Sequence, residues 1–69
     1  MPLTLIEAGK ACRVRAVGGS DAVRRHLGDM GFVAGATVAV VSEVAGGLIV
    51  DVCGTRVALD ADLARRILV

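Results

Sequence analysis

Nine glycines, against a single proline, are spread along this 69-residue chain and divide it into short segments. Because glycine adopts the positive φ angles that tight turns need, this spacing favours turns between short elements over long helices. The apolar residues are chiefly Val, Ala, Leu and Ile, and Phe32 is the only aromatic residue. Since β-branched residues pack well on pleated surfaces, we expect one small, mainly β domain over residues 1–69.

Alternation of apolar and polar residues predicts the strands. In the segment 11–17, Cys12, Val14 and Ala16 fall on one face and the two arginines fall on the other. Further strands are expected at 36–44, 48–53, 56–59 and 67–69, and residues 4–6 are expected to form an extended lead-in. The pairs Gly46-Gly47 and Gly54-Thr55 supply the hairpin turns between the middle strands.

One helix is predicted after the first strand. Ser20 or Asp21 can cap its first turn. Gly31 suits the left-handed position that closes a helix. Gly28, inside the helix, costs ~1 kcal/mol relative to Ala, which suggests close backbone packing at that point. The apolar stripe of this helix is formed by Val23, Leu27 and Met30.

A second helical turn is expected at 61–65, capped by Asp60 and followed by the last strand. The order is then a strand, a helix, a three-strand meander, a helical turn and a closing strand. Short antiparallel strands bury their inner faces by closing into a barrel, which also removes exposed sheet edges. We therefore expect a small SH3-like β-barrel with the helix covering one opening.

Patterns that carry catalysis are not found in this sequence. The only histidine is His26, and neither Ser20 nor Ser42 lies in a nucleophile elbow. No glycine-rich phosphate loop is found, because Gly46-Gly47 lies between two strands and not between a strand and a helix. A barrel this small also has an interior filled by side chains. We therefore expect a binding protein that is not an enzyme and needs no cofactor.

The candidate metal ligands are isolated from one another. None of Cys12, His26, Asp29 and Cys53 forms a close pair such as C-x-x-C, although His26 and Asp29 lie three residues apart on the helix. By strand phase, Cys12 points inward and Cys53 points outward. We expect no intrachain metal site, with weak ion binding through His26 or a cysteine left open as an alternative.

Charge and hydropathy bound the class of partner. Eight basic and seven acidic residues give a net charge of +1, and Tyr and Trp are absent, which argues against nucleic acid. No apolar stretch approaches the ~20 residues of a membrane span, and no secretory signal is present, so we expect a cytosolic protein with reduced thiols. A mean hydropathy of +0.72 suggests that a partner covers some apolar surface.

Apolar residues in the outward phase of two strands form the candidate partner surface. In the strand 36–44, Ala39 and Val41 lie in phase with the polar Thr37 and Glu43. In the next strand, Ile49 lies in phase with an aspartate. Neighbouring strands bring these three apolar residues together, so we expect a docking or dimer surface.

The helix provides the second group of candidate contacts. Arg24, Arg25 and Asp29 lie on its polar side. Charged residues around an apolar patch guide the association of two proteins, so these three residues are expected to form a rim of the interface.

The run Arg25–Gly35, with the letters RHLGDMGFVAG, resembles the signature of the ferrous-iron transport protein A family, FeoA. That signature is a basic helix ending in Leu-x-x-(Leu/Met)-Gly-(Phe/Leu/Met), then x-Pro-Gly and a Val-rich strand. Leu3–Gly9 resembles the opening segment of the family, and Val57–Val69 resembles its closing Ala-Leu segment and Ile-x-Val strand. Three departures are Ala34 in place of the usual Pro, residues 46–48 in place of Gly-Asp-Pro, and Asp60 at a position that is often Arg.

The resemblance implies an SH3-like fold and a cytosolic accessory role in bacterial ferrous-iron uptake. The implied partner is the membrane transporter FeoB, through its cytosolic part, and the departure at Asp60 leaves any docking role of that arginine open. Three alternatives remain at this stage: a small module that binds a divalent ion itself, a nucleic-acid-binding barrel, and self-association as a homodimer.

Overall fold

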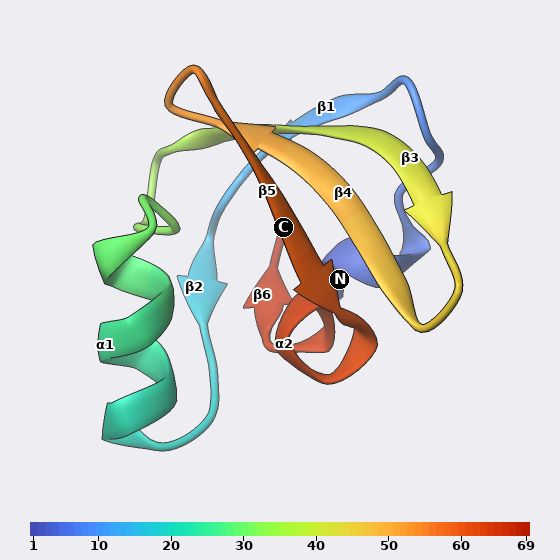
Figure 1. The fold of residues 1–69 in the computed structure, drawn as a ribbon. Helices are drawn as coiled ribbons and strands as arrows, with labels where there is room; N and C mark the ends of the chain where they lie inside the picture. The colour runs from blue at the N-terminus through green and yellow to red at the C-terminus, as the bar shows by residue number, and fades with distance from the viewer.

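The computed structural model describes residues 1–69, which form six β-strands and two α-helices (Figure 1). In chain order the elements are β1 (Ala11–Arg13), β2 (Ala16–Val17), α1 (Asp21–Asp29), β3 (Thr37–Val44), β4 (Gly47–Val52), β5 (Thr55–Asp60), α2 (Ala61–Arg65) and β6 (Ile67–Leu68). The mainly β composition is confirmed, and both helices lie where the sequence predicts them.

The strands form two antiparallel sheets. One has the order β1-β3-β4-β5, and the other pairs β2 with β6. Figure 1 shows the larger sheet curving over β2, β6 and α2. The ends of the chain lie side by side, since the backbone N–H of Val69 donates to the carbonyl oxygen of Met1 at 2.7 Å. The expected closure without sheet edges was wrong, because β6 pairs with β2 and β5 keeps an unpaired side.

The interior between the two sheets is entirely apolar. In β4, Leu48, Val50 and Val52 are buried at every second position, as a strand with one buried face requires. Phe32 has 1% of its surface exposed. The twelve buried residues are Leu3, Val14, Leu27, Phe32, Val38, Val40, Leu48, Val50, Val52, Leu59, Ala64 and Ile67.

A β-bulge in β3 sets the orientation of its second half. Val40 pairs with Val50, but the next pair joins Ser42 to Ile49, so Val41 is an extra residue. A bulge places two residues opposite one, and Val41 therefore remains on the outer face beside Ile49. Glu43 then pairs with Leu48, a buried residue. The use of Glu43 as a marker of the outer face was therefore wrong. The bulge at Val41 shifts the inward–outward alternation by one residue before the chain reaches Glu43.

Local sequence explains α1. The Ser20 hydroxyl accepts a hydrogen bond from the Val23 N–H at 3.3 Å, which caps the first turn as predicted. Leu27 is fully buried, and it anchors the apolar stripe of the helix in the core. Gly31 follows the helix with φ of +103°, which confirms its predicted closing role.

The first predicted strand is broken in two. The Val14 N–H donates to the Ala36 carbonyl and the Arg15 N–H donates to the Leu68 carbonyl, both at 2.8 Å. The chain thus passes from one sheet to the other between these residues, and the alternation changes phase. Ala16, expected to point inward, is exposed for this reason.

Three local expectations also need correction. The start of the chain is a turn of 3-10 helix at Leu3–Leu5, not an extended lead-in, and the Ile6 N–H donates to the Leu3 carbonyl. An added Cβ at Gly28 would meet no atom within 4 Å, so the expected close packing there is absent. The second hairpin turns at Cys53–Gly54, one residue earlier than predicted, with φ of 53° and 76°.

Candidate interaction surface

The outer face of the large sheet holds the predicted apolar residues. Val41 is 36% exposed, whereas Ala39 and Ile49 are half-buried. Val41 and Ile49 are neighbours across β3 and β4, and Ala39 lies one row away, opposite Asp51. The three residues therefore share one face, and we call them the outer patch. Ala58 of β5 extends the patch, since it lies opposite Ile49 and is exposed.

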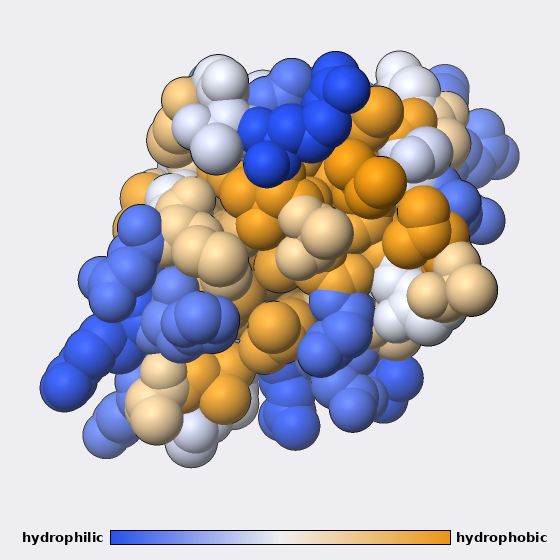
Figure 2. Space-filling model, in the orientation of Figure 1, coloured by the Kyte–Doolittle hydropathy of each residue, from blue (hydrophilic) through white to orange (hydrophobic).

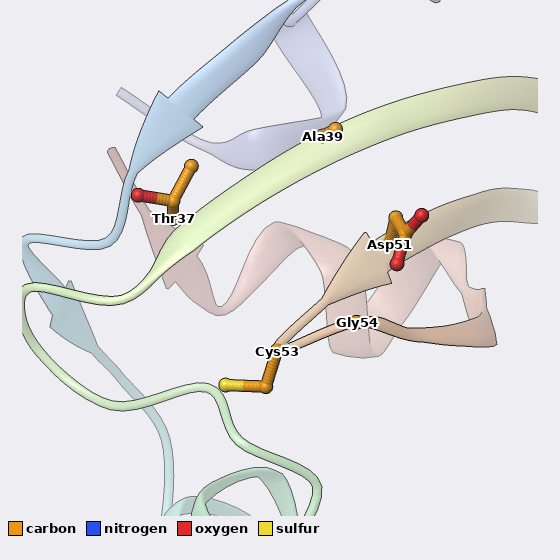
Figure 3. Close-up of a pocket in the computed structure, with 5 residues that line it drawn as sticks. All are labelled: Thr37, Ala39, Asp51, Cys53 and Gly54. Atoms are coloured by element: carbon orange, nitrogen blue, oxygen red, sulfur yellow. The ribbon is translucent and has the colours of Figure 1, made fainter.

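An open hollow adjoins the outer patch (Figure 3). It has a volume of about 420 Å³ and is lined by Thr37, Ala39, Asp51, Cys53 and Gly54. Figure 3 shows the Cys53 side chain reaching toward the connector between α1 and β3. The lining offers the Asp51 carboxylate, the Thr37 hydroxyl and the Cys53 thiol.

The predicted rim on α1 lies in another part of the molecule. Arg24, Arg25 and Asp29 are all exposed. The Arg24 guanidinium forms an ion pair with the Asp21 carboxylate one turn earlier, whereas Arg25 and Asp29 form none. Figure 1 shows α1 beside β2 and away from the middle of β3 and β4. The structure therefore does not bring the rim and the outer patch into one cluster.

The isolated metal-ligand candidates stay apart. No three His, Cys, Asp or Glu side chains lie close enough together to hold a metal ion. Burial raises the pKa of the half-buried Cys12 thiol. Cys53 is exposed, and its Sγ would lie 3.2 Å from a Cβ added at Gly31. His26 is exposed on α1.

Two arginines at the flanks of the outer face were not among the predicted site residues. Arg13 of β1 lies opposite Thr37, and Arg56 of β5 lies opposite Asp51. Strand phase could have placed both arginines on an outer face. The local pattern does not predict the strand pairing, which places these two arginines at opposite edges of one sheet.

The architecture defines a small SH3-like β domain, and the outer patch lies on the exposed face of its larger sheet. No helix of the chain is long and apolar enough to cross a membrane. The family model described as "FeoA domain" matches residues 1–69. The chain therefore belongs to the FeoA family, which is associated with ferrous-iron transport.

Solved structures support this assignment. A crystal structure of an iron uptake regulatory protein, FeoA, is 32% identical with a TM-score of 0.89, over 97% of this chain and 91% of that one. The FeoA of Stenotrophomonas maltophilia, solved with zinc and described as a prokaryotic SH3 domain protein, is 31% identical with a TM-score of 0.86, over 99% and 87%.

The FeoA protein of Chlorobium tepidum is 30% identical with a TM-score of 0.89, over 99% of this chain and 67% of that one. A search of curated proteins finds no match to the sequence. The neighbours confirm the SH3-like fold and the family resemblance that the sequence predicts.

Proposed function

We propose that this chain is a cytosolic accessory protein of ferrous-iron uptake that binds the cytosolic part of a FeoB-type transporter and modulates its assembly or activity. The observation that carries the proposal is the family match over all 69 residues. The S. maltophilia relative is described as a candidate activating factor of ferrous-iron transport, which agrees with an accessory role.

The outer patch is the proposed docking surface. Ala39, Val41 and Ile49 present apolar surface on a rigid sheet, and burial of such surface drives association. The neighbouring hollow can receive a protruding side chain, and Asp51 inside it favours a cationic or hydrogen-bonding group.

The rim on α1 is the second proposed contact surface for the transporter. Arg25 and Asp29 lack intrachain ion-pair partners, so their charges are free to meet charges on another protein. Arg24 is already paired with Asp21 and is expected to add less. The Cα atoms of the whole domain extend over only 28 × 23 × 21 Å. A large partner can therefore contact both α1 and the outer face of the sheet.

A pull-down tests the proposal. The chain is immobilised and exposed to the detergent-solubilised transporter encoded in the same genome. The native chain should retain the transporter, and the double variant Val41→Lys with Ile49→Lys should lose it. Val33→Lys is the matched control, because Val33 is 52% exposed and lies on the connector after α1. Equal retention by all three proteins would exclude the outer patch, and retention by none would contradict the proposal.

A further inference from the structure

The strand β5 has one side that pairs with nothing in this chain. It pairs with β4 along its whole length, from Thr55 opposite Val52 to Asp60 opposite Gly47. In a hairpin with a two-residue turn, the residues that flank the turn exchange hydrogen bonds, and every second pair beyond them does the same. The residues between those pairs point their backbone groups away from the partner strand.

Arg56 and Ala58 are the residues whose N–H and C=O groups both face the open side, and the N–H of Asp60 faces it as well. No turn, loop or cap hydrogen bond involves the backbone of Arg56 or Ala58, whereas Asp60 is the N-cap of α2, the position whose C=O accepts the first hydrogen bond of a helix. All three residues are exposed. An exposed row of unpaired backbone groups is a template for another strand.

The side chains of these residues carry a specific charge order. Arg56 is basic, Ala58 is small and neutral, and Asp60 is acidic. Arg56 and Asp60 take part in no ion pair, and the Asp60 Oδ1 accepts only the capping hydrogen bond from the Leu63 N–H at 2.8 Å. Figure 2 shows apolar atoms over the middle of β5 and hydrophilic groups toward its two ends.

We propose that β5 pairs with β5 of a second copy of this chain, antiparallel about a twofold axis at Ala58. In an antiparallel pair, side chains that meet must point to the same face, so outward residues must meet outward residues. Placing the axis at Ala58 sets Ala58 opposite its own copy and Arg56 opposite Asp60 of the other copy, on both sides of the axis. Arg56 and Ala58 contribute both backbone groups to this pairing, and Asp60 contributes its N–H.

The charge order selects a second copy over an unrelated strand. A sequence that runs from positive through neutral to negative becomes its own complement when a copy is turned antiparallel, as an isologous interface requires. The alternative axis at Val57 would place Arg56 opposite Ala58 and leave both charges unmatched. The pairing joins two four-stranded sheets into one continuous sheet.

The dimer is expected to be weak. Edge pairing buries little apolar surface, so we expect a Kd on the order of 100 µM. The two Arg56–Asp60 contacts are exposed to solvent, and salt should therefore weaken the dimer.

Sedimentation equilibrium of the isolated chain between about 20 µM and about 1 mM tests the pairing, since this range brackets the expected Kd. The native chain should approach twice its monomer mass. Ala58→Pro should remain monomeric, because proline lacks the N–H that the second copy needs while β4 does not use it. A native chain that stays monomeric, or an Ala58→Pro variant that still dimerises, would overturn the proposal.

A charge exchange provides a second test that does not depend on proline. Arg56→Asp and Asp60→Arg should each be monomeric alone, because like charges then face each other. Their equimolar mixture should form a heterodimer, since every facing pair is again opposite in sign. Arg13→Asp makes the same charge change on the other edge strand and should dimerise normally. Dimers of either single variant, or no heterodimer in the mixture, would contradict the register.

The outer patch offers the competing surface for self-association. Val41→Lys should leave the β5 dimer intact, and a loss of dimerisation in this variant alone would overturn the β5 assignment. The test uses only this chain, so its result is independent of the transporter proposal.

Discussion

A Cβ added at Gly47 would lie 2.1 Å from the carbonyl oxygen of Leu59 and 3.0 Å from the Cα of Asp60. The first residue of β4 thus lies against the backbone where β5 ends and α2 begins. The Ala61 N–H donates to the neighbouring Gly46 carbonyl at 2.8 Å, which holds this junction together.

Gly47→Ala should destabilise the fold strongly, because the obstructing atoms belong to the backbone and cannot rotate away. We expect a loss of about 3 kcal/mol in the free energy of unfolding, at the upper end of overpacking effects. Urea unfolding followed by circular dichroism measures it. A loss below ~0.5 kcal/mol, typical of a harmless surface change, would show that the junction is not as tight as described.

Gly28→Ala should have the opposite effect. Gly28 lies inside α1 with a negative φ, and an added Cβ would meet nothing within 4 Å. Alanine restricts the unfolded chain and favours the helix, so stability should rise by about 0.5–1 kcal/mol. The same urea experiment tests this change, and any decrease in stability would indicate a packing contact at that helix face.

Phe32→Ala should bring the protein close to unfolding. Phe32 is the only aromatic ring and is 1% exposed, so truncation removes the largest buried side chain. The expected loss is about 3–5 kcal/mol, comparable to the whole stability of a domain this small. The adjacent Val33→Ala, at a 52% exposed site, serves as the control and should change the thermal midpoint little. Equal effects of the two changes would contradict the assigned core.

The two thiols should differ in their reaction with a thiol reagent near neutral pH. Burial raises the pKa of the Cys12 thiol and leaves less thiolate, whereas Cys53 is exposed. The variant Cys12→Ala should therefore react fast and Cys53→Ala slowly. The reverse order of rates would place Cys12 outside the protected position that we describe.

The raised Cys12 pKa also predicts a dependence of stability on pH. At alkaline pH the unfolded chain loses the thiol proton before the folded chain does. The free energy of unfolding should decline as pH rises past the unfolded thiol pKa of about 8.5. Cys12→Ala should lack this part of the decline and Cys53→Ala should retain it. Identical pH profiles for both variants would contradict the shift.

The fold followed from the sequence wherever local pattern and burial agree. The alternation in Leu48–Val52 predicted both the strand and its buried face, and Ser20 and Gly31 marked the limits of α1. The predictions failed where tertiary contacts, and not the local sequence pattern, determine the backbone structure. Val14 and Arg15 bond to different sheets, so the strand breaks although its letters alternate without interruption.

The candidate surface was predicted in part. Val41 was expected on the outer face and lies there, because it follows the buried Val40. The bulge at Val41 changes the alternation only from Ser42 onward, and no turn residue in the sequence indicates it. Arg56 was missed as part of that face, because its position depends on the register between β4 and β5. Partner binding stays a prediction for the six proposed contact residues, which are Arg24, Arg25, Asp29, Ala39, Val41 and Ile49.

The most direct test of the docking proposal is an NMR titration of the ¹⁵N-labelled chain with the unlabelled cytosolic part of a FeoB-type transporter. Amide signals of Ala39, Val41 and Ile49 should shift or broaden, together with those of Arg25 and Asp29, while signals of α2 remain unchanged. Unperturbed spectra at saturating partner, or changes confined to α2 and β6, would contradict the account.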